Sequence, residues 1–378
     1  MSKFSMLWGG AAVVAFCAAG FMGWLFSLPA TTVPAEAPPV PQEAMAAMLA
    51  SLQPCKHERP LIAVVGINDA TETTDYLMPP GILRRADVAD VVMLATGPGP
   101  VQLYPALTVA PDATIEAFDA AHPEGADYVI VPAMSRDDDP AVLAWLRSQA
   151  QKQAVIIGVC AGAKVVGAAG LLDGHRATTH WYYRDALLAR SPTIEYVANQ
   201  RMVADRGVVT TTGITASMPM MLTLIEAIAG RAKAEAVARD LGLVQWDARH
   251  TSDAFQFTRP FAATVLANRL AFWRREQFGF PLEPGMDEVS LALVADTWSR
   301  TYRASAVTFA AATSAIMTAN GIHVLPDRVA TDWPADRRAS IFPDQRPAEA
   351  LDQVLAEITA RYGERTTDVV AMQLEYPQ

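Results

Sequence analysis

A cysteine lies between two glycines in the segment Gly158-Val159-Cys160-Ala161-Gly162, directly after the apolar run 154–157. The run predicts a buried strand, and the small residues after it predict a sharp turn into a helix, as in hydrolases that present a nucleophile there. A thiol at a helix N-terminus lies beside free backbone amides, which lower its pKa and favour the thiolate. The alternative is an inert, buried cysteine. The strand, the glycines and the helix start together favour a reactive thiol at Cys160.

The elements that must position this thiol are predicted from four apolar runs, at residues 61–65, 91–94, 128–131 and 154–157. Runs without alternation are typical of strands covered on both faces. Helical segments such as 141–152 lie between them, so we predict a doubly wound parallel sheet, a flavodoxin-like α/β sandwich. Ligands of such sheets bind at the carboxyl ends of the strands, where Cys160 lies.

Several segments resemble the ThiJ/PfpI superfamily of class I glutamine-amidotransferase-like proteins; they are Gly158–Gly162, Ala168–Gly174, Ala177–Trp181 and Thr210–Ala216. The resemblance runs from about residue 60 to residue 243 and is greatest for the kind of domain fused to AraC-type regulators. We therefore delimit this domain as residues 57–243. The resemblance implies a cysteine nucleophile at Cys160 with His180 beside it.

The imidazole of His180 could exchange a proton with the thiol or with a leaving group, whereas on its own it would more simply be structural. The family also places a carboxylate in the turn after the first strand, close to the nucleophile. Asp75 matches that position best, and Glu72 is the alternative. The other five histidines show no ligand spacing, so we predict neither a metal nor a cofactor.

The expected oxyanion hole departs from the family pattern. Relatives carry Pro-Gly-Gly after the third strand, whereas this chain has Pro132-Ala133-Met134. The backbone amides of Ala133 or Met134, together with that of Ala161, are the candidates for stabilising a developing oxyanion. Side chains at 133 and 134 predict a narrower or differently turned loop, which disfavours efficient acyl chemistry.

The N-terminus is uncharged from Met6 to Leu28. A helix over these residues would be ~34 Å long, enough to cross a bilayer core. We therefore expect residues 1–28 to be a transmembrane anchor, with a cleaved signal peptide as the alternative. Lys3 predicts that the main body lies on the periplasmic side of the inner membrane. Residues 29–56 are rich in proline and predict an extended linker.

Residues 244–378 are predicted to be mostly helical, with helices at 261–277, 287–301, 304–319 and 348–362 and strands at 322–325 and 369–374. They contain no basic recognition helix, and no long internal repeat is evident. The 378-residue chain has 30 basic and 40 acidic side chains, a net charge of −10. This balance argues against nucleic acid as a partner.

These features predict a cysteine-dependent hydrolase, hydratase or lyase that acts on a small molecule. One alternative is a non-catalytic module that binds a ligand or senses oxidants through Cys160. Another is a divergent relative of the amidotransferase-like transcription regulators. Expected partners are a small molecule and the membrane, and a homodimer is compatible with the sequence.

Overall fold

The computed structural model describes residues 16–17, 19–30, 36–54 and 56–376. Its centre is a seven-stranded sheet in the order β11-β12-β8-β7-β1-β3-β6, in which only β11 and β12 pair antiparallel. The strands are β1 Leu61–Gly66, β3 Asp90–Ala95, β6 Ala113–Thr114, β7 Tyr128–Val131, β8 Val155–Gly158, β11 Met202–Asp205 and β12 Val208–Thr211. All four predicted apolar runs are strands of this sheet.

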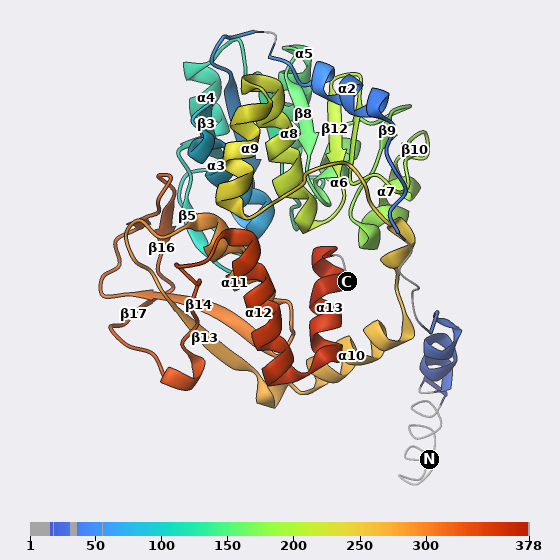
Figure 1. Cartoon of the computed structure of the whole chain (residues 1–378), viewed down its shortest axis with the longest axis vertical. Helices are drawn as coiled ribbons and strands as arrows, with labels where there is room; N and C mark the ends of the chain where they lie inside the picture. Colours follow the sequence, from blue (N-terminus) through green and yellow to red (C-terminus); the bar gives the residue numbers. More distant parts are fainter. Residues whose placement is uncertain (1–15, 18, 31–35, 55, 377–378) are drawn as a thin grey trace, which may run out of the picture.

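Helices cover both faces of the sheet (Figure 1). One face is covered by α3 Thr73–Ala86, α8 Ser217–Ala229 and α9 Arg231–Leu241; the other is covered by α4 Ile115–Ala121, α5 Pro140–Gln151, α6 Gly162–Ala168 and α7 Arg184–Arg190. A separate apolar cluster fills each face. The doubly wound sandwich expected from the sequence is therefore present. A short helix, α2 Gln42–Ser51, precedes β1 within the predicted linker.

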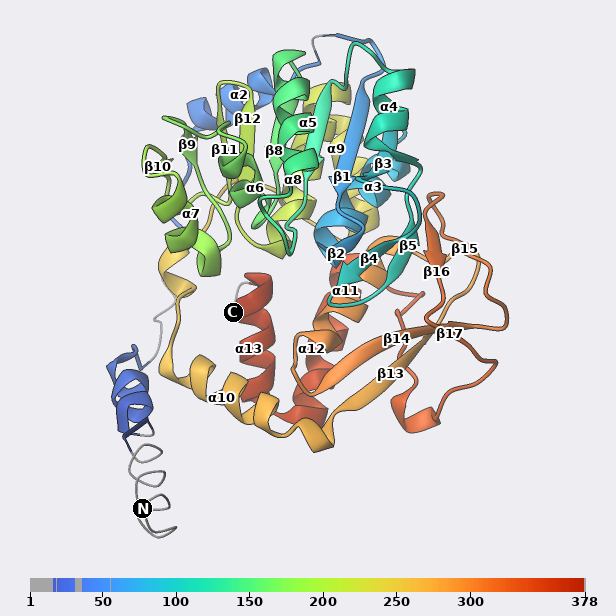
Figure 2. The same cartoon turned by 180° about the vertical axis from the view of Figure 1, so that it is seen from behind.

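The C-terminal region adds four helices, α10 Arg259–Leu270, α11 Glu288–Ser299, α12 Pro347–Tyr362 and α13 Glu364–Leu374. It also adds the parallel sheet β13-β14-β17, formed by Glu276–Pro281, Ala304–Ala310 and Arg328–Val329. The hairpin β15 Ile316–Met317 and β16 His323–Leu325 extends a sheet that contains β5 Thr108–Ala110, β4 Val101–Tyr104 and β2 Asp69–Glu72 (Figure 2). A two-stranded pair, β9 Arg176–Ala177 and β10 Glu195–Tyr196, completes the strands of the described residues.

The prediction of a mostly helical C-terminal region was wrong in three places. The expected helix 304–319 is β14 followed by β15, the expected strand 369–374 belongs to α13, and the expected helix 261–277 ends at Leu270 before β13 begins. Short apolar runs do not distinguish a buried helix from a strand, and tertiary packing decides between them.

The prediction of a transmembrane helix at 6–28, and with it a single-pass inner-membrane location, is corrected. Among the described residues no helix combines the length and apolarity needed to cross a bilayer. Residues 1–15 and 18 of the predicted segment lie outside the described residues. Its described part, helical at 19–27, packs against the protein: the ring of Trp24 lies 5.9 Å from that of Phe257, tilted by 47°, and the guanidinium of Arg259 donates to the carbonyl of Phe26.

Candidate active site around Cys160

Cys160 lies at the turn between β8 and α6 with a left-handed backbone, φ +55°. This conformation is unusual for a residue with a side chain and is typical of a nucleophile elbow. Its amide donates to Oγ1 of Thr211 at 3.0 Å, and its carbonyl accepts from Oγ1 of Thr179 at 3.1 Å. A Cβ on Gly162 would lie 1.9 Å from the carbonyl oxygen of Val131, so only glycine fits there. Hydrogen bonds and a close backbone approach therefore hold the strained turn in place.

Asp75 is the carboxyl group next to this thiol. It lies in the first turn of α3, where its amide donates to the capping Glu72 at 2.6 Å. Its Oδ2 accepts from the amide of Ala133 at 3.1 Å, while the buried Oδ1 has no hydrogen-bond partner within the described structure. Burial raises the pKa of Asp75 to about 7, although the Ala133 amide, Arg300 and the Cys160 side chain oppose the increase. Near neutral pH this carboxyl can therefore either accept or donate a proton.

The thiol of Cys160 is free and buried. Burial raises its pKa well above the usual range, and the charges of Asp75, Glu72 and Glu375 add to this increase. The amide of Ala161 opposes it, as expected at a helix start, but is outweighed. The expectation that the helix N-terminus makes Cys160 a thiolate is thus corrected: the resting side chain is a neutral thiol that needs a base.

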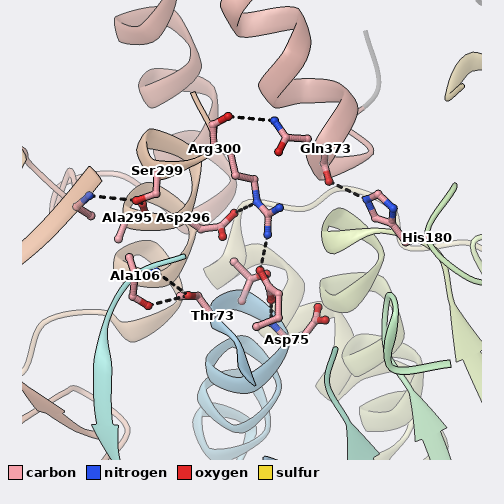
Figure 3. Close-up of polar contacts among 12 residues, drawn as sticks. Thr73, Asp75, Ala106, His180, Ala295, Asp296, Ser299, Arg300 and Gln373 are labelled. Carbon is pink, nitrogen blue, oxygen red and sulfur yellow. Dashed lines mark hydrogen bonds and ion pairs between the residues drawn. The ribbon is translucent and has the colours of Figure 1, made fainter. Parts of the chain in front are cut away.

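The sequence prediction missed Arg300, which follows α11 and reaches the same place. Its Nε donates to Oδ2 of Asp296 at 2.5 Å (Figure 3). Its Nη2 donates to Oε1 of Glu72 at 2.6 Å. The carboxylates of Asp296 and Glu72 raise the pKa of Arg300 against the opposing effect of burial, so it stays charged. A permanent positive charge from the C-terminal region therefore lies beside the acidic end of α3.

His180 is held by two backbone groups. Its Nδ1 accepts from the amide of Tyr182 at 3.2 Å, and its Nε2 lies 2.9 Å from the carbonyl oxygen of Gln373 in α13 (Figure 3). Because an amide only donates and a carbonyl only accepts, the ring is neutral with its proton on Nε2. Burial lowers the pKa of His180, consistent with this state. The ring lines the same cavity as Cys160, but both nitrogens are engaged elsewhere.

The candidate oxyanion amides are partly occupied. The amide of Ala133 donates to Asp75, and that of Ala161 interacts with the sulfur of Cys160. Met134 forms an isolated antiparallel bridge with Thr71, which fixes the loop that replaces the family's glycines. All three residues line the cavity, and the amides of Ala133 and Ala161 already stabilise the resting side chains of Asp75 and Cys160.

A cavity of about 680 Å³ opens over Cys160. One wall is aromatic and comes from the N-terminal helix, the loop after His180 and the start of α10: Phe21, Trp24, Trp181, Tyr182, Phe257 and Phe261. The charged side chains that line it are Glu72, Asp137, Lys164, Arg269 and Arg300. The volume and lining are typical of a site for a small, largely apolar molecule. In the described part of the chain, no three His, Cys, Asp or Glu side chains gather as metal ligands.

Residues 62–227 match the DJ-1/PfpI family. This stretch is a DJ-1/PfpI family domain. Isonitrile hydratase of Pseudomonas putida is 41% identical over 105 residues, which are 28% of this chain and 44% of that protein. The Parkinson disease protein 7 homolog of Danio rerio is 29% identical over 44% of this chain and 89% of its own length. The regulator CdhR of Pseudomonas aeruginosa is 32% identical over 37% of this chain and 41% of its own length.

The chain therefore spans less than half the length of the hydratase and of the regulator. Among solved structures, a THiJ/PfpI family protein from Pseudomonas syringae is 26% identical, with a TM-score of 0.43 over 48% of this chain and 74% of that chain. An AraC family regulator from Pseudomonas putida is 20% identical, with a TM-score of 0.42 over 48% of this chain and 98% of that chain. The resemblance predicted from the sequence is confirmed for residues 62–227.

Proposed function

We propose that the chain is a cysteine-dependent hydratase or hydrolase in which Cys160 attacks an electrophilic carbon of a small, largely apolar molecule. The observation that carries the proposal is the neutral thiol at a strained elbow, open to the cavity and next to a buried carboxyl group whose pKa is about 7. A base with a pKa near the working pH is the most effective partner for such a thiol.

Asp75 is the proposed proton carrier, because its Oδ1 is unpartnered beside the thiol whereas both nitrogens of His180 are engaged. His180 then serves to fix the cavity wall against α13. The amides of Ala161 and of Ala133 or Met134 are proposed to stabilise the negative charge that develops on the substrate, once the thiol proton has moved.

An isonitrile is the substrate class we propose, from the similarity to the isonitrile hydratase. Sγ of Cys160 forms a bond to the terminal carbon of the isonitrile, and the thiol proton passes through Asp75 to that carbon, giving a thioimidate. Water then adds across the carbon–nitrogen double bond. The carbon–sulfur bond breaks as the thiol regains its proton, and a formamide leaves. The sum is isonitrile plus water to formamide, with the enzyme unchanged.

A second candidate is a module that binds a small ligand in this cavity without turning it over. The occupied amides of Ala133 and Ala161 favour it, because they leave less stabilisation for a reaction intermediate. An oxidant sensor is less well supported, since oxidants react with the thiolate and burial keeps Cys160 protonated.

The first prediction separates these functions. The purified full chain should convert a small alkyl or aryl isonitrile to the formamide, followed by mass spectrometry of the product. Cys160→Ser should lower kcat/KM by about a thousandfold or more. The matched control is Cys17→Ser, because Cys17 is an exposed cysteine that does not line the cavity. Binding of the isonitrile without turnover in the wild type would favour the ligand-binding module.

A further inference from the structure

Strands of the C-terminal region repeat the registers of β3, β4, β5 and β6. Val101 pairs with Val109 and Ile316 pairs with Val324, both antiparallel. Leu94 pairs with Ala113 and Phe309 pairs with Arg328, both parallel. Each residue lies a constant 215 positions after its counterpart, as from Val109 to Val324. Unrelated strands would not keep one constant spacing from all of β3, β4, β5 and β6 to their counterparts.

Side chains that fix these elements are repeated at the same spacing. Oδ2 of Asp112 accepts from the amide of Met93 at 2.7 Å, and Oδ2 of Asp327 accepts from the amide of Thr308 at 2.8 Å. Both aspartates follow a proline. The first strand is the least regular part of the match, because the register of β13 on β14 is displaced by one residue from that of β1 on β3.

The helices α3 and α11 are counterparts as well. Glu72 caps α3 by accepting from the amide of Asp75, and Asp287 caps α11 by accepting from the amide of Ser290 at 2.7 Å. The two helices pack against each other, and each N-cap pairs with an arginine at the C-terminal end of the other helix. Arg300 binds Glu72, and its counterpart Arg85 binds Asp287. Contacts that are exchanged in this way define a pseudo-two-fold axis.

The same axis passes between the hairpins β4–β5 and β15–β16, which lie side by side in Figure 2. In the pairing of β16 with β5, Val324 lies opposite its own counterpart Val109, with His323 opposite Ala110 and Leu325 opposite Thr108. Two equivalent surfaces meet in this way across a two-fold axis, here within one chain.

A second pair of helices is repeated too. Gly230 joins α8 to α9 with φ 84° and ψ 165°, and Gly363 joins α12 to α13 with φ 84° and ψ 160°. Counted from these two glycines, Arg346 is the counterpart of Gly213 and Glu375 is the counterpart of Gly242. The contact is again exchanged, because Glu375 lies against Gly213 and Arg346 lies against Gly242. Between β17 and α12 the C-terminal copy has only a short connection, where the first copy carries β7, β8, the elbow and β12.

We propose that residues 276–375 are a second, shortened copy of the fold that has lost the nucleophile elbow and serves as a built-in partner for the first copy. It covers the α3 face, and it supplies Arg300 as a positioning residue for the single thiol site. Because the second copy covers the α3 face, that face is not available for a homodimer.

The repeat provides a matched control, because Arg300 and Arg85 make equivalent ion pairs with side chains that are 14% and 16% exposed. Of these two arginines, only Arg300 lines the cavity. The charged or titratable groups around Cys160 are Glu72, Asp75, Asp296, Arg300, Glu375, His180, Tyr183 and Lys164. Arg300 is the cation that directly neutralises Glu72, so its loss should favour the protonated forms of the nearby carboxyl groups.

The second prediction compares Arg300→Gln with Arg85→Gln in the full chain. The readout is the pH dependence of alkylation of Cys160 by iodoacetamide, followed by peptide mass spectrometry, which needs no turnover and so is independent of the proposed activity. Arg300→Gln should move the rise in rate near pH 7 to higher pH, whereas Arg85→Gln should leave it in place. Arg300→Lys, which keeps the charge, should restore most of the profile.

If Arg300→Gln does not fold, Arg300→Lys still tests the role of Arg300. A lysine cannot bind Glu72 and Asp296 together as the planar guanidinium does, so Arg300→Lys should shift the rise in alkylation rate in the same direction but by less. Equal shifts in the two arginine variants, or none in either, would overturn the role given to Arg300. Sedimentation of the full chain should show no dimer that depends on the α3 face. A dimer that Arg85→Gln and Arg300→Gln both dissociate would overturn the built-in partner.

Discussion

The two copies of the β-α-β unit share their strands, hairpin, helix caps and exchanged ion pairs, yet only the first leads to a nucleophile. In the first copy Asp75 occupies the first turn of α3 and is completely buried; in the second its counterpart is Ser290. The first copy continues through β7 and β8 to the strained turn at Cys160, whereas the second passes directly to α12. Packing, helix caps and ion pairs are therefore common to both copies, and the chemistry depends on a few residues that only one copy has.

The largest expected effect comes from breaking the elbow that distinguishes the first copy. Gly162→Ala places a Cβ 1.9 Å from the carbonyl oxygen of Val131, and neither backbone segment can move without disturbing β7 or α6. We expect a loss of more than about 3 kcal/mol of stability, or failure to fold. Chemical denaturation measures it.

The matched control for Gly162→Ala is Gly23→Ala, where an added Cβ meets nothing within 4 Å and the residue is helical. Its stability should change by less than about 1 kcal/mol. If both variants were equally stable, the close approach at the elbow would not be the constraint that the geometry indicates.

A moderate effect is expected from making Asp75 resemble its uncharged counterpart Ser290. The pKa of Asp75 in the folded chain is about 7, above its ordinary value of 3.8. The folded state therefore keeps a proton that the unfolded state releases, and this contribution to stability is lost as pH rises from about 4 through 7. Asp75→Asn should remove part of that dependence and raise the melting temperature at pH 8 by a few degrees.

Circular dichroism melts at pH 5 and pH 8 test this, with Ser290→Ala as the control on the second copy. Its effect should be the same at both pH values, because a serine does not titrate in this range. A pH-dependent change in Ser290→Ala, or none in Asp75→Asn, would remove the distinction between the two helix starts.

The sequence was sufficient to predict the sheet and the elbow of the first copy, because both depend on local patterns. Unbroken apolar runs predicted β1, β3, β7 and β8, and glycines on both sides of Cys160 predicted the turn. The second copy was missed because few of its counterpart residues are identical; Pro-Asp at 111–112 and 326–327 and the pair Arg85 and Arg300 are among them. The register of the strand pairs, which depends on tertiary structure, still shows the repeat where the side chains differ.

The charge environment of the thiol was beyond a local prediction. Arg300 and Glu375 are distant from Cys160 in the sequence, and the only local signal is Asp296 one helical turn before Arg300. The helix-start argument for a low thiol pKa failed for the same reason: burial and three carboxylates outweigh one amide. Likewise, the contact of His180 with Gln373 in α13 exists only after folding.

The most direct test of the central claim, that Asp75 takes the proton of Cys160, is the pH profile of Cys160 alkylation in the wild type and in Asp75→Asn. In the wild type the rate should rise through about pH 7 as Asp75 ionises, and again at high pH as the thiol ionises on its own. Asp75→Asn should keep only the rise at high pH. A rise near pH 7 that persists in Asp75→Asn would contradict the account.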